Sequence, residues 1–261
     1  MYKFSKRIFD IVSSSIVCII LAPFLLPIVI LLRLTSEGEV FYLQERIGLN
    51  KKPFMIFKFA TMLKNSSKMA GGIITVKNDP RVTFMGGFLR KSKINELPQL
   101  INIIIGDMSV VGPRPVMKAS FEAYPSKIQE VIYNVKPGLT GIGSIIFRDE
   151  EDLISNIKND GGDIWDFYKN TIYPFKGEVE IWYQNNKSFF LDIKLIFITL
   201  WVVFSPNSKI YEKLFKNEYE LIKPLHDLQI KSVNKTIKHV KMGNIKLAEK
   251  SIKPAIHYLI K

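Results

Sequence analysis

The stretch Asn95-Glu96-Leu97-Pro98-Gln99-Leu100 decides how this chain is interpreted, because it joins an amide, a carboxylate and a proline at a predicted helix boundary. Two further segments follow within about twenty residues, Gly106-Asp107-Met108-Ser109 and Gly112-Pro113-Arg114-Pro115. An adjacent Asn and Glu alone would indicate only an ordinary capping pair. The order and spacing of the three segments are specific, and together they predict a functional site.

The pattern around Glu96 predicts two short helices that meet near the carboxylate. A first helix is expected to begin at residues 87–90, with Ser92 as its cap if it starts later. Pro98 fits the first turn of a second helix or a kink, where its missing donor costs least. Helix starts attract phosphate groups, and a carboxylate there, downstream of Arg90, suits phosphoryl chemistry with a divalent cation.

The amino-acid composition limits the classes of protein to which this chain can belong. The 261 residues are 47% hydrophobic, which excludes a disordered chain. A net charge of +13 suits an anionic partner such as nucleic acid, an anionic membrane face or a phosphate-rich substrate. No segment resembles a nucleic-acid-binding fold, so nucleic acid is not an expected partner. The single cysteine, Cys18, excludes an intrachain disulfide and a cysteine-rich metal site, and it is interpreted as packing.

Residues 11–32 form an apolar run without a charged side chain. At ~1.5 Å per residue, the run is long enough to cross a hydrocarbon core of ~30 Å. Pro23 and Pro27 interrupt its second half, and basic residues flank both ends, which favours both ends facing the cytoplasm. We therefore expect a re-entrant membrane helix hairpin that breaks at Pro23, with a straight span as the alternative.

Short strands are expected after this run, at residues 40–42 and 55–59, around a turn at residues 48–53. Two cations lie in this region, Arg46 after the first strand and Lys58 in the second. An Arg fork matches phosphate oxygens, and a Lys supplies a point charge. Both residues are candidates for phosphate contacts, and solvated surface charge is the alternative.

Taken together, these segments resemble the bacterial sugar transferases, also called monotopic phosphoglycosyl transferases. The resemblance covers about residues 4–204. Besides the segments around Glu96, it rests on Lys6, Arg7 and Asp10, on Gln44, Arg46 and Gly48, on Lys58-Phe59-Ala60-Thr61-Met62 and on Lys136-Pro137-Gly138-Leu139-Thr140-Gly141. The chain departs from the family pattern at Asn95, where the family has Asp, at Ala60 in place of Arg, and at residues 142–147, after which Arg148 is retained.

The resemblance implies transfer of a sugar 1-phosphate from a UDP-sugar to polyprenyl (undecaprenyl) phosphate, with release of UMP. It places this step at the cytoplasmic face of the bacterial inner membrane, in contact with membrane lipid, and is compatible with a homodimer. Glu96 and Asn95 hold the catalytic positions, and Glu96 is implied to bind Mg²⁺. The residues expected to bind substrate or phosphate are Arg46, Lys58, Arg90, Asp107, Arg114 and Arg148.

Asn95 restricts the mechanism, because an amide carries no negative charge and its nitrogen lone pair is delocalised. If the chain is active, either Glu96 attacks the phosphorus or the acceptor displaces UMP directly. The alternative is a catalytically inactive homologue that binds a lipid phosphate or a partner transferase.

The expected fold is α+β and helix-rich, with a small α/β catalytic core and interfacial amphipathic helices. We divide the chain into residues 1–35 (membrane helix), 36–206 (catalytic domain) and 207–261 (basic extension). Residues 188–204 suit a helix in the membrane interface or in the core. The extension carries twelve lysines against five acidic residues, and apolar residues at 230, 233, 237 and 240 predict an amphipathic helix.

Overall fold

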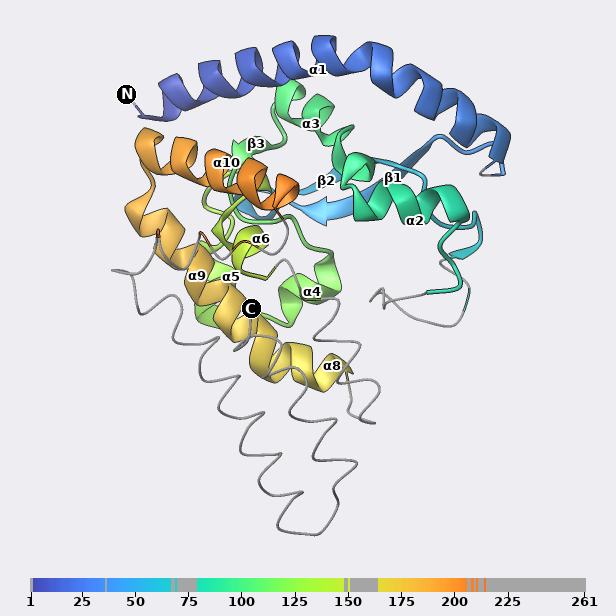
Figure 1. The fold of residues 1–261 in the computed structure, drawn as a ribbon. Helices are drawn as coiled ribbons and strands as arrows, with labels where there is room; N and C mark the ends of the chain where they lie inside the picture. The colour runs from blue at the N-terminus through green and yellow to red at the C-terminus, as the bar shows by residue number, and fades with distance from the viewer. Residues whose placement is uncertain are drawn as a thin grey trace.

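The structure is a computed structural model, and it describes residues 2–35, 37–66, 69, 79–147, 150, 164–205, 208, 210 and 214. Over these residues the protein is helix-rich and contains two small two-stranded sheets, which confirms the predicted α+β class. Figure 1 shows the long helix α1 arching along one side of the molecule, with the shorter elements on its concave side. The predicted division at residues 35 and 206 stays a prediction. The apolar pattern at residues 230–240 lies outside the described residues, as does Arg148.

Helix α1 is one continuous helix over Tyr2–Thr35, so the structure does not contain the expected hairpin of two helices. Both Pro23 and Pro27 lie inside it. A proline removes only its own backbone donor and bends a helix without having to end it. The turns after Pro23 are held against the domain because Leu32 is fully buried and packs with Phe59 and Leu89. Tertiary packing therefore keeps the second half of α1 continuous with the first half.

The start of α1 is fixed to the domain by charged groups. The Arg7 guanidinium donates to the carbonyls of Ile103 and Ile104, at 2.6 and 2.8 Å. Asp10 is 2% exposed, and its Oδ1 accepts the Val110 N–H at 3.0 Å. The motif that the sequence shares with the family at this end thus connects α1 to the elements that follow the site.

An antiparallel hairpin follows, formed by β1 (Phe41–Ile47) and β2 (Pro53–Phe59), with the short helix η1 (Leu49–Lys51) between them. It confirms the strands and the turn expected from the sequence. Asn102 is fully buried and holds β2, since its Oδ1 accepts the Phe57 N–H at 2.9 Å and its Nδ2 donates to the Met55 carbonyl at 2.7 Å.

The segment around Glu96 forms three short helices: α2 (Phe84–Lys91), η3 (Ile94–Glu96) and α3 (Gln99–Ile105). Thr83 caps the start of α2 by accepting the Gly86 N–H at 3.0 Å. Ser92 instead ends this helix, because its Oγ donates to the Phe88 carbonyl at 2.8 Å, so it does not cap a later start. Pro98 immediately precedes α3, at the boundary where the sequence predicted it.

A second sheet joins β3 (Ser109–Val111) to β4 (Gly138–Thr140) in parallel, and it brings the turns that carry Gly112 and Gly138 together. The Gly112 N–H donates to the Thr140 carbonyl at 2.9 Å, and the Gly138 N–H to the Pro113 carbonyl at 2.8 Å. A Cβ on Gly138 would lie 2.1 Å from the Gly112 nitrogen. Only glycine allows this crossing, which positions the segment that carries Arg114.

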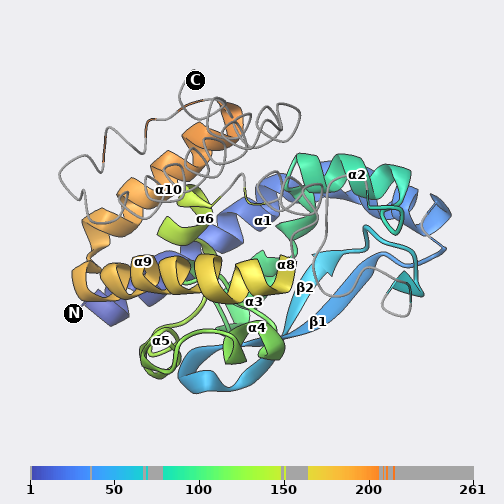
Figure 2. The same cartoon turned by 90° about the horizontal axis from the view of Figure 1, so that it is seen from below.

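The remaining helices supply most of the largest apolar core of the described residues. Figure 2 shows α6 between α9 and α10, both of which it contacts. Ser188 caps α10 and accepts the Leu191 N–H at 3.2 Å. One side of α10 is core, with Leu195 and Ile198 fully buried, whereas Phe190 and Phe204 are 86% and 82% exposed. These helices are α4 (Lys118–Glu122), α5 (Ser126–Val131), α6 (Ile142–Ile146), α8 (Ile164–Phe167), the π-helical η4 (Tyr168–Ile172), α9 (Tyr173–Asn186) and α10 (Phe189–Phe204).

Candidate functional site

The centre of the candidate site is an ion pair between Glu96, at the end of η3, and Arg114, which follows β3. The Arg114 guanidinium binds both carboxylate oxygens: Nη1 donates to Oε2 at 3.2 Å, and Nη2 donates to Oε1. The Glu96 side chain is 14% exposed and that of Arg114 is 37% exposed, so the pair opens to solvent on the arginine side. Two of the three segments singled out in the sequence therefore meet in one bidentate contact.

The hairpin supplies two more cations. Tyr42 lies opposite Lys58, and Arg46 lies four residues after Tyr42 on the same strand. Because alternate residues of a strand share a face, Arg46 and Lys58 are on the same face of the hairpin. Nη2 of Arg46 donates to Oε1 of Gln44 at 2.5 Å, which fixes this side chain within the strand. Gln44, Arg46 and Lys58, all part of the family resemblance, thus belong to one surface of β1 and β2.

Electrostatics confirm that these groups are neighbours. Burial acts to raise the pKa of Glu96, but Arg114, through its charge and its hydrogen bonds, and the charges of Lys58 and Lys93 lower that pKa to about 2. Burial lowers the pKa of Lys58 to about 7, with further lowering by Arg46, Arg114 and Arg90. Burial together with the charge of Arg114 lowers the pKa of Arg46 to about 10. The site therefore gathers five cationic residues around the ionised carboxylate of Glu96.

Asn95 lies beside this carboxylate and is 8% exposed. Lys93, with a φ of 60°, adopts a left-handed conformation that ends α2 and turns the chain into η3. The Oδ1 atom of Asn95 is buried and has no hydrogen-bond partner among the described residues. A buried acceptor without a partner costs free energy, which marks this atom as a group available to a ligand.

Of the predicted site residues, Asp107 is not assembled with Glu96, and Arg148 cannot be placed. Asp107 follows the C-terminal end of α3, whereas Glu96 precedes the N-terminal end. The charge of Asp107 acts on Lys136, the pKa of which is lowered by burial and by Arg7. Arg148 lies outside the described residues. Both assignments as binding residues stay predictions.

Four residues near the site were not predicted from the sequence. The Tyr133 hydroxyl donates to the Arg114 carbonyl at 2.8 Å. Burial raises the pKa of Glu180 on α9 to about 8, and Lys176 and the backbone N–H groups of Arg114 and Gly143 act to lower it. Lys176 pairs with Glu150 at 2.8 Å, and the charge of Arg114 also acts on Glu150. No local pattern could have revealed these contacts, because each joins residues that are far apart in the sequence and separated by several elements.

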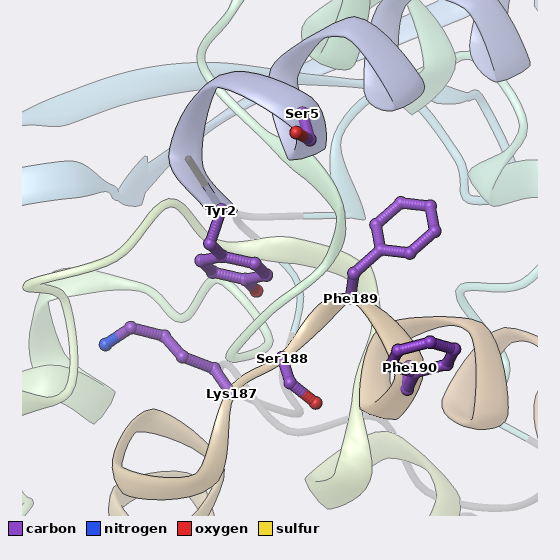
Figure 3. Close-up of a pocket in the computed structure, with 6 residues that line it drawn as sticks. All are labelled: Tyr2, Ser5, Lys187, Ser188, Phe189 and Phe190. Atoms are coloured by element: carbon purple, nitrogen blue, oxygen red, sulfur yellow. The ribbon is translucent and has the colours of Figure 1, made fainter.

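A cavity of about 550 Å³ lies elsewhere, between the start of α1 and the junction of α9 with α10. Its lining residues are Tyr2, Ser5, Lys187, Ser188, Phe189 and Phe190, and none of them belongs to the group around Glu96. Figure 3 shows the Tyr2 ring and the Lys187 chain on one side, and the two phenylalanine rings on the other. The cavity and the charged group around Glu96 are thus separate parts of the described structure.

The fold and the charged group define a class of protein that handles phosphate groups next to a long apolar helix. The chain belongs to the bacterial sugar transferase family, whose model matches residues 1–206. This finding confirms the resemblance recognised in the sequence.

Three relatives illustrate the match. The chain is 37% identical over 201 residues to a UDP-glucose:undecaprenyl-phosphate glucose-1-phosphate transferase of Klebsiella pneumoniae, covering 75% of this chain and 39% of the relative. It is 35% identical over 189 residues to the exopolysaccharide production protein ExoY of Rhizobium meliloti, covering 66% and 83%. It is 32% identical over 216 residues to an undecaprenyl-phosphate galactose phosphotransferase of Salmonella typhimurium, covering 77% and 40%. The chain thus spans about two fifths of the first and third relatives.

Proposed function

We propose that the chain transfers a sugar 1-phosphate from a UDP-sugar to polyprenyl phosphate and releases UMP. The observation that carries this proposal is the Glu96–Arg114 pair with Arg46, Lys58 and Arg90 around it. Both substrates carry phosphate groups, and arginine forks bind phosphate oxygens bidentately. The relatives named for undecaprenyl-phosphate sugar phosphate transfer support the same reaction class.

Each cation has a role that its position supports. Arg114 leaves one side open to solvent while it contacts Glu96, so its guanidinium can reach a phosphoryl oxygen. Arg46 and Lys58 share a face of the hairpin and supply charge beside it. Such preorganised charge stabilises the negative charge that develops in phosphoryl transfer.

Mg²⁺ fits this donor set when the substrate completes it. Among the described residues no group of three or more His, Cys, Asp or Glu side chains could hold a metal. Mg²⁺, however, is commonly held by one or two carboxylates together with substrate phosphates. Glu96 offers a carboxylate, and Asn95 offers a buried oxygen without a partner among the described residues. A bound ion would neutralise diphosphate charge at this position.

The route that the site supports is a direct displacement. Both oxygens of Glu96 are engaged by Arg114, and Asn95 cannot act as a nucleophile. An oxygen of the polyprenyl phosphate attacks the β-phosphorus of the UDP-sugar, forming a new P–O bond. The bond from that phosphorus to the bridging oxygen breaks, and UMP leaves with the oxygen and its electron pair. Because Asn95 is uncharged where the family has Asp, the site has one negative charge fewer, and this favours binding of two phosphate-bearing substrates at the same time.

We place α1 in the cytoplasmic leaflet of the inner membrane, with both of its ends on the cytoplasmic side. By length and composition, α1 is the one helix of the described part of the chain that could cross a membrane. Its two ends, however, contact the same domain through Arg7 and Leu32. Apolar side chains on its outer side stay exposed, including Ile19 at 74% and Phe24 at 69%. Phe190 and Phe204 of α10 would lie at the membrane interface.

The reaction is tested by measuring UMP release from a panel of UDP-sugars with undecaprenyl phosphate and Mg²⁺. UMP release from at least one sugar, dependent on the lipid phosphate, is expected. Absence of release from the whole panel would contradict the proposed activity.

The route is tested with a UDP-sugar that carries a chiral thiophosphate at the β-phosphorus. Direct displacement inverts the configuration at phosphorus, whereas two successive displacements through a covalent intermediate retain it. Retention, or a phosphosugar adduct on the protein, would contradict the direct route while leaving the proposed activity intact.

The membrane position is tested in a Cys18→Ser background by introducing Ser5→Cys and Thr35→Cys, which mark the two ends of α1. In intact cells neither cysteine should react with an impermeant maleimide, and both should react after the inner membrane is opened. Labelling of one end alone in intact cells would show that the helix crosses the membrane.

A further inference from the structure

Tyr133 is a buried residue that contacts the segment of the central arginine without belonging to the charged group. It follows the end of α5 and is 1% exposed. Its hydroxyl donates to the Arg114 carbonyl at 2.8 Å and accepts the Val116 N–H at 3.1 Å. These two backbone groups lie on either side of Pro115, which has no N–H of its own. One side chain therefore bridges the turn that carries Arg114.

The same turn is bound to strand β1 by its next two carbonyls. The Pro115 carbonyl accepts a hydrogen bond from Nη1 of Arg46 at 3.4 Å. The Val116 carbonyl accepts the Ile47 N–H at 2.9 Å. The segment that carries Arg114 thus lies directly against the strand that carries Arg46, and Tyr133 binds this segment from the α5 side.

Tyr133 is itself fixed by two other parts of the fold. Its backbone carbonyl accepts the Asn50 N–H at 2.8 Å, in the turn between β1 and β2. Nε2 of Gln184, on α9, donates to the carbonyls of Val131 and Ile132 at 2.9 and 3.0 Å. The backbone on which Tyr133 stands is therefore held by α9 and by the turn of the hairpin.

We propose that Tyr133 is a positioning residue, which fixes the backbone of Arg114 against the hairpin so that the guanidinium of Arg114 stays beside Glu96 and the cations of β1 and β2. The activity readouts of this inference rest on the proposed function, whereas the exchange readout below does not. Tyr133 acts through Arg114 and does not touch the substrates. A misplacement of a catalytic group by about 1 Å can lower turnover on the order of 10²-fold.

The hydroxyl suits this role because it stays protonated. Burial raises the pKa of Tyr133 further above its ordinary value. The hydroxyl can therefore donate to Arg114 and accept from Val116 at the same time. A phenylalanine would fill the same space but would leave both backbone groups without this partner, and unpaired buried polar groups are costly. The turn should then shift or open.

The test compares Tyr133→Phe with Tyr124→Phe. Tyr124 is a matched control because it is also buried, at 3% exposed, and packs against the Tyr173 ring at 4.9 Å. Its hydroxyl makes no hydrogen bond within the described part of the chain. Tyr133→Phe should lower kcat for UMP release per folded molecule by roughly 10- to 10²-fold, with a smaller change in KM for the UDP-sugar. Tyr124→Phe should keep the wild-type kcat.

A rescue separates positioning from packing. With p-aminophenylalanine in place of Tyr133, an aromatic amine of nearly the same size donates to the Arg114 carbonyl again. This variant should recover most of the turnover that Tyr133→Phe loses. The three side chains at position 133 fill similar space, so a role in packing alone would give equal turnover in all three proteins.

Hydrogen exchange gives a readout that does not depend on activity. A peptide over residues 113–116 carries backbone N–H groups only at Arg114 and Val116, because the other two residues are prolines. Exchange in this peptide should accelerate in Tyr133→Phe and remain slow in Tyr124→Phe. This result is expected even if the wild-type chain releases no UMP, so failure of the proposed function is distinguishable from failure of the inference.

If Tyr133→Phe does not fold, which circular dichroism and thermal melting would show, the p-aminophenylalanine variant carries the test. Its turnover should stay near that of the wild type, whereas exchange at Val116 should accelerate because an aromatic amine is a weaker acceptor than a hydroxyl. The inference would be overturned by unchanged exchange in folded Tyr133→Phe, by equal kcat in Tyr133→Phe and Tyr124→Phe, or by a folded p-aminophenylalanine variant without turnover.

Discussion

An arginine lies at each end of α3, but the polar groups at the two ends differ in whether they have hydrogen-bond partners. At the C-terminal end, the Arg7 guanidinium donates one hydrogen bond to the carbonyl of Ile103 and one to that of Ile104. Gly106 then turns the chain away from the helix with a φ of 106°. Near its N-terminal end, Arg114 is bound to Glu96, and the Oδ1 atom of Asn95 has no partner among the described residues. Saturated polar groups hold a structure together, whereas buried groups left open are available to a ligand. The comparison assigns stability to one end and chemistry to the other.

The largest effect is expected from Glu96→Gln, at the chemical end. Removal of the carboxylate charge should lower UMP release by about 10²-fold or more, because a charged group is lost where charge develops in the transition state. The melting temperature should fall as well, because the ion pair with Arg114 that lowers the pKa of Glu96 to about 2 is lost, so turnover is compared per folded molecule. Turnover equal to that of the wild type at saturating Mg²⁺ would falsify the assignment of Glu96.

Arg7→Met, at the C-terminal end of α3, should lower the stability of the fold. Two charge-assisted hydrogen bonds to buried carbonyls are lost, so the free energy of unfolding should fall by roughly 2 kcal/mol. Denaturant unfolding in detergent micelles measures the loss, and UMP release per folded molecule should stay near that of the wild type. A large drop in specific turnover without a loss of stability would contradict the division between the two ends.

The next largest effect is expected on the pH dependence of the KM for the UDP-sugar, through Lys58 at the N-terminal end of α3. The pKa of Lys58 is lowered to about 7, so the unliganded site loses this charge as the pH rises through that value. The KM for the UDP-sugar should therefore increase between pH 6.5 and about 8.5. Lys58→Arg should flatten this increase, because the guanidinium stays charged across the range. A KM that rises equally in both proteins would show that another group is responsible.

The smallest effect is expected from Asp107→Asn. This substitution tests whether Asp107 acts with Arg7 at the C-terminal end of α3 or with Glu96 in the binding site. Asp107 follows α3 on the side of Arg7 and Lys136. A partly exposed charge away from the reacting phosphates should change stability by no more than about 0.5 kcal/mol and leave turnover nearly the same. A loss of turnover comparable to that of Glu96→Gln would instead place Asp107 in the binding site.

Much of the site could be predicted because its residues lie in short, specific segments. The order of the motifs predicts Glu96 and Arg114 in one site, and the structure joins them in a bidentate pair. The hairpin carrying Arg46 and Lys58 was marked by strand-like residues around a turn. The contact of Tyr133 with Arg114 could not be predicted, since Tyr133 lies in no recognisable motif and reaches Arg114 across many residues.

The sequence by itself determined the family, the apolar N-terminal segment, the hairpin and the excess of positive charge, because these depend on composition and on patterns within a few residues. Tertiary structure decided that α1 continues through Pro23, since contacts of Leu32 with Phe59 and Leu89 hold its second half in place. It also decided which end of α3 is left open for a ligand. Such choices depend on contacts between distant segments, where packing and unsatisfied polar groups outweigh local preference.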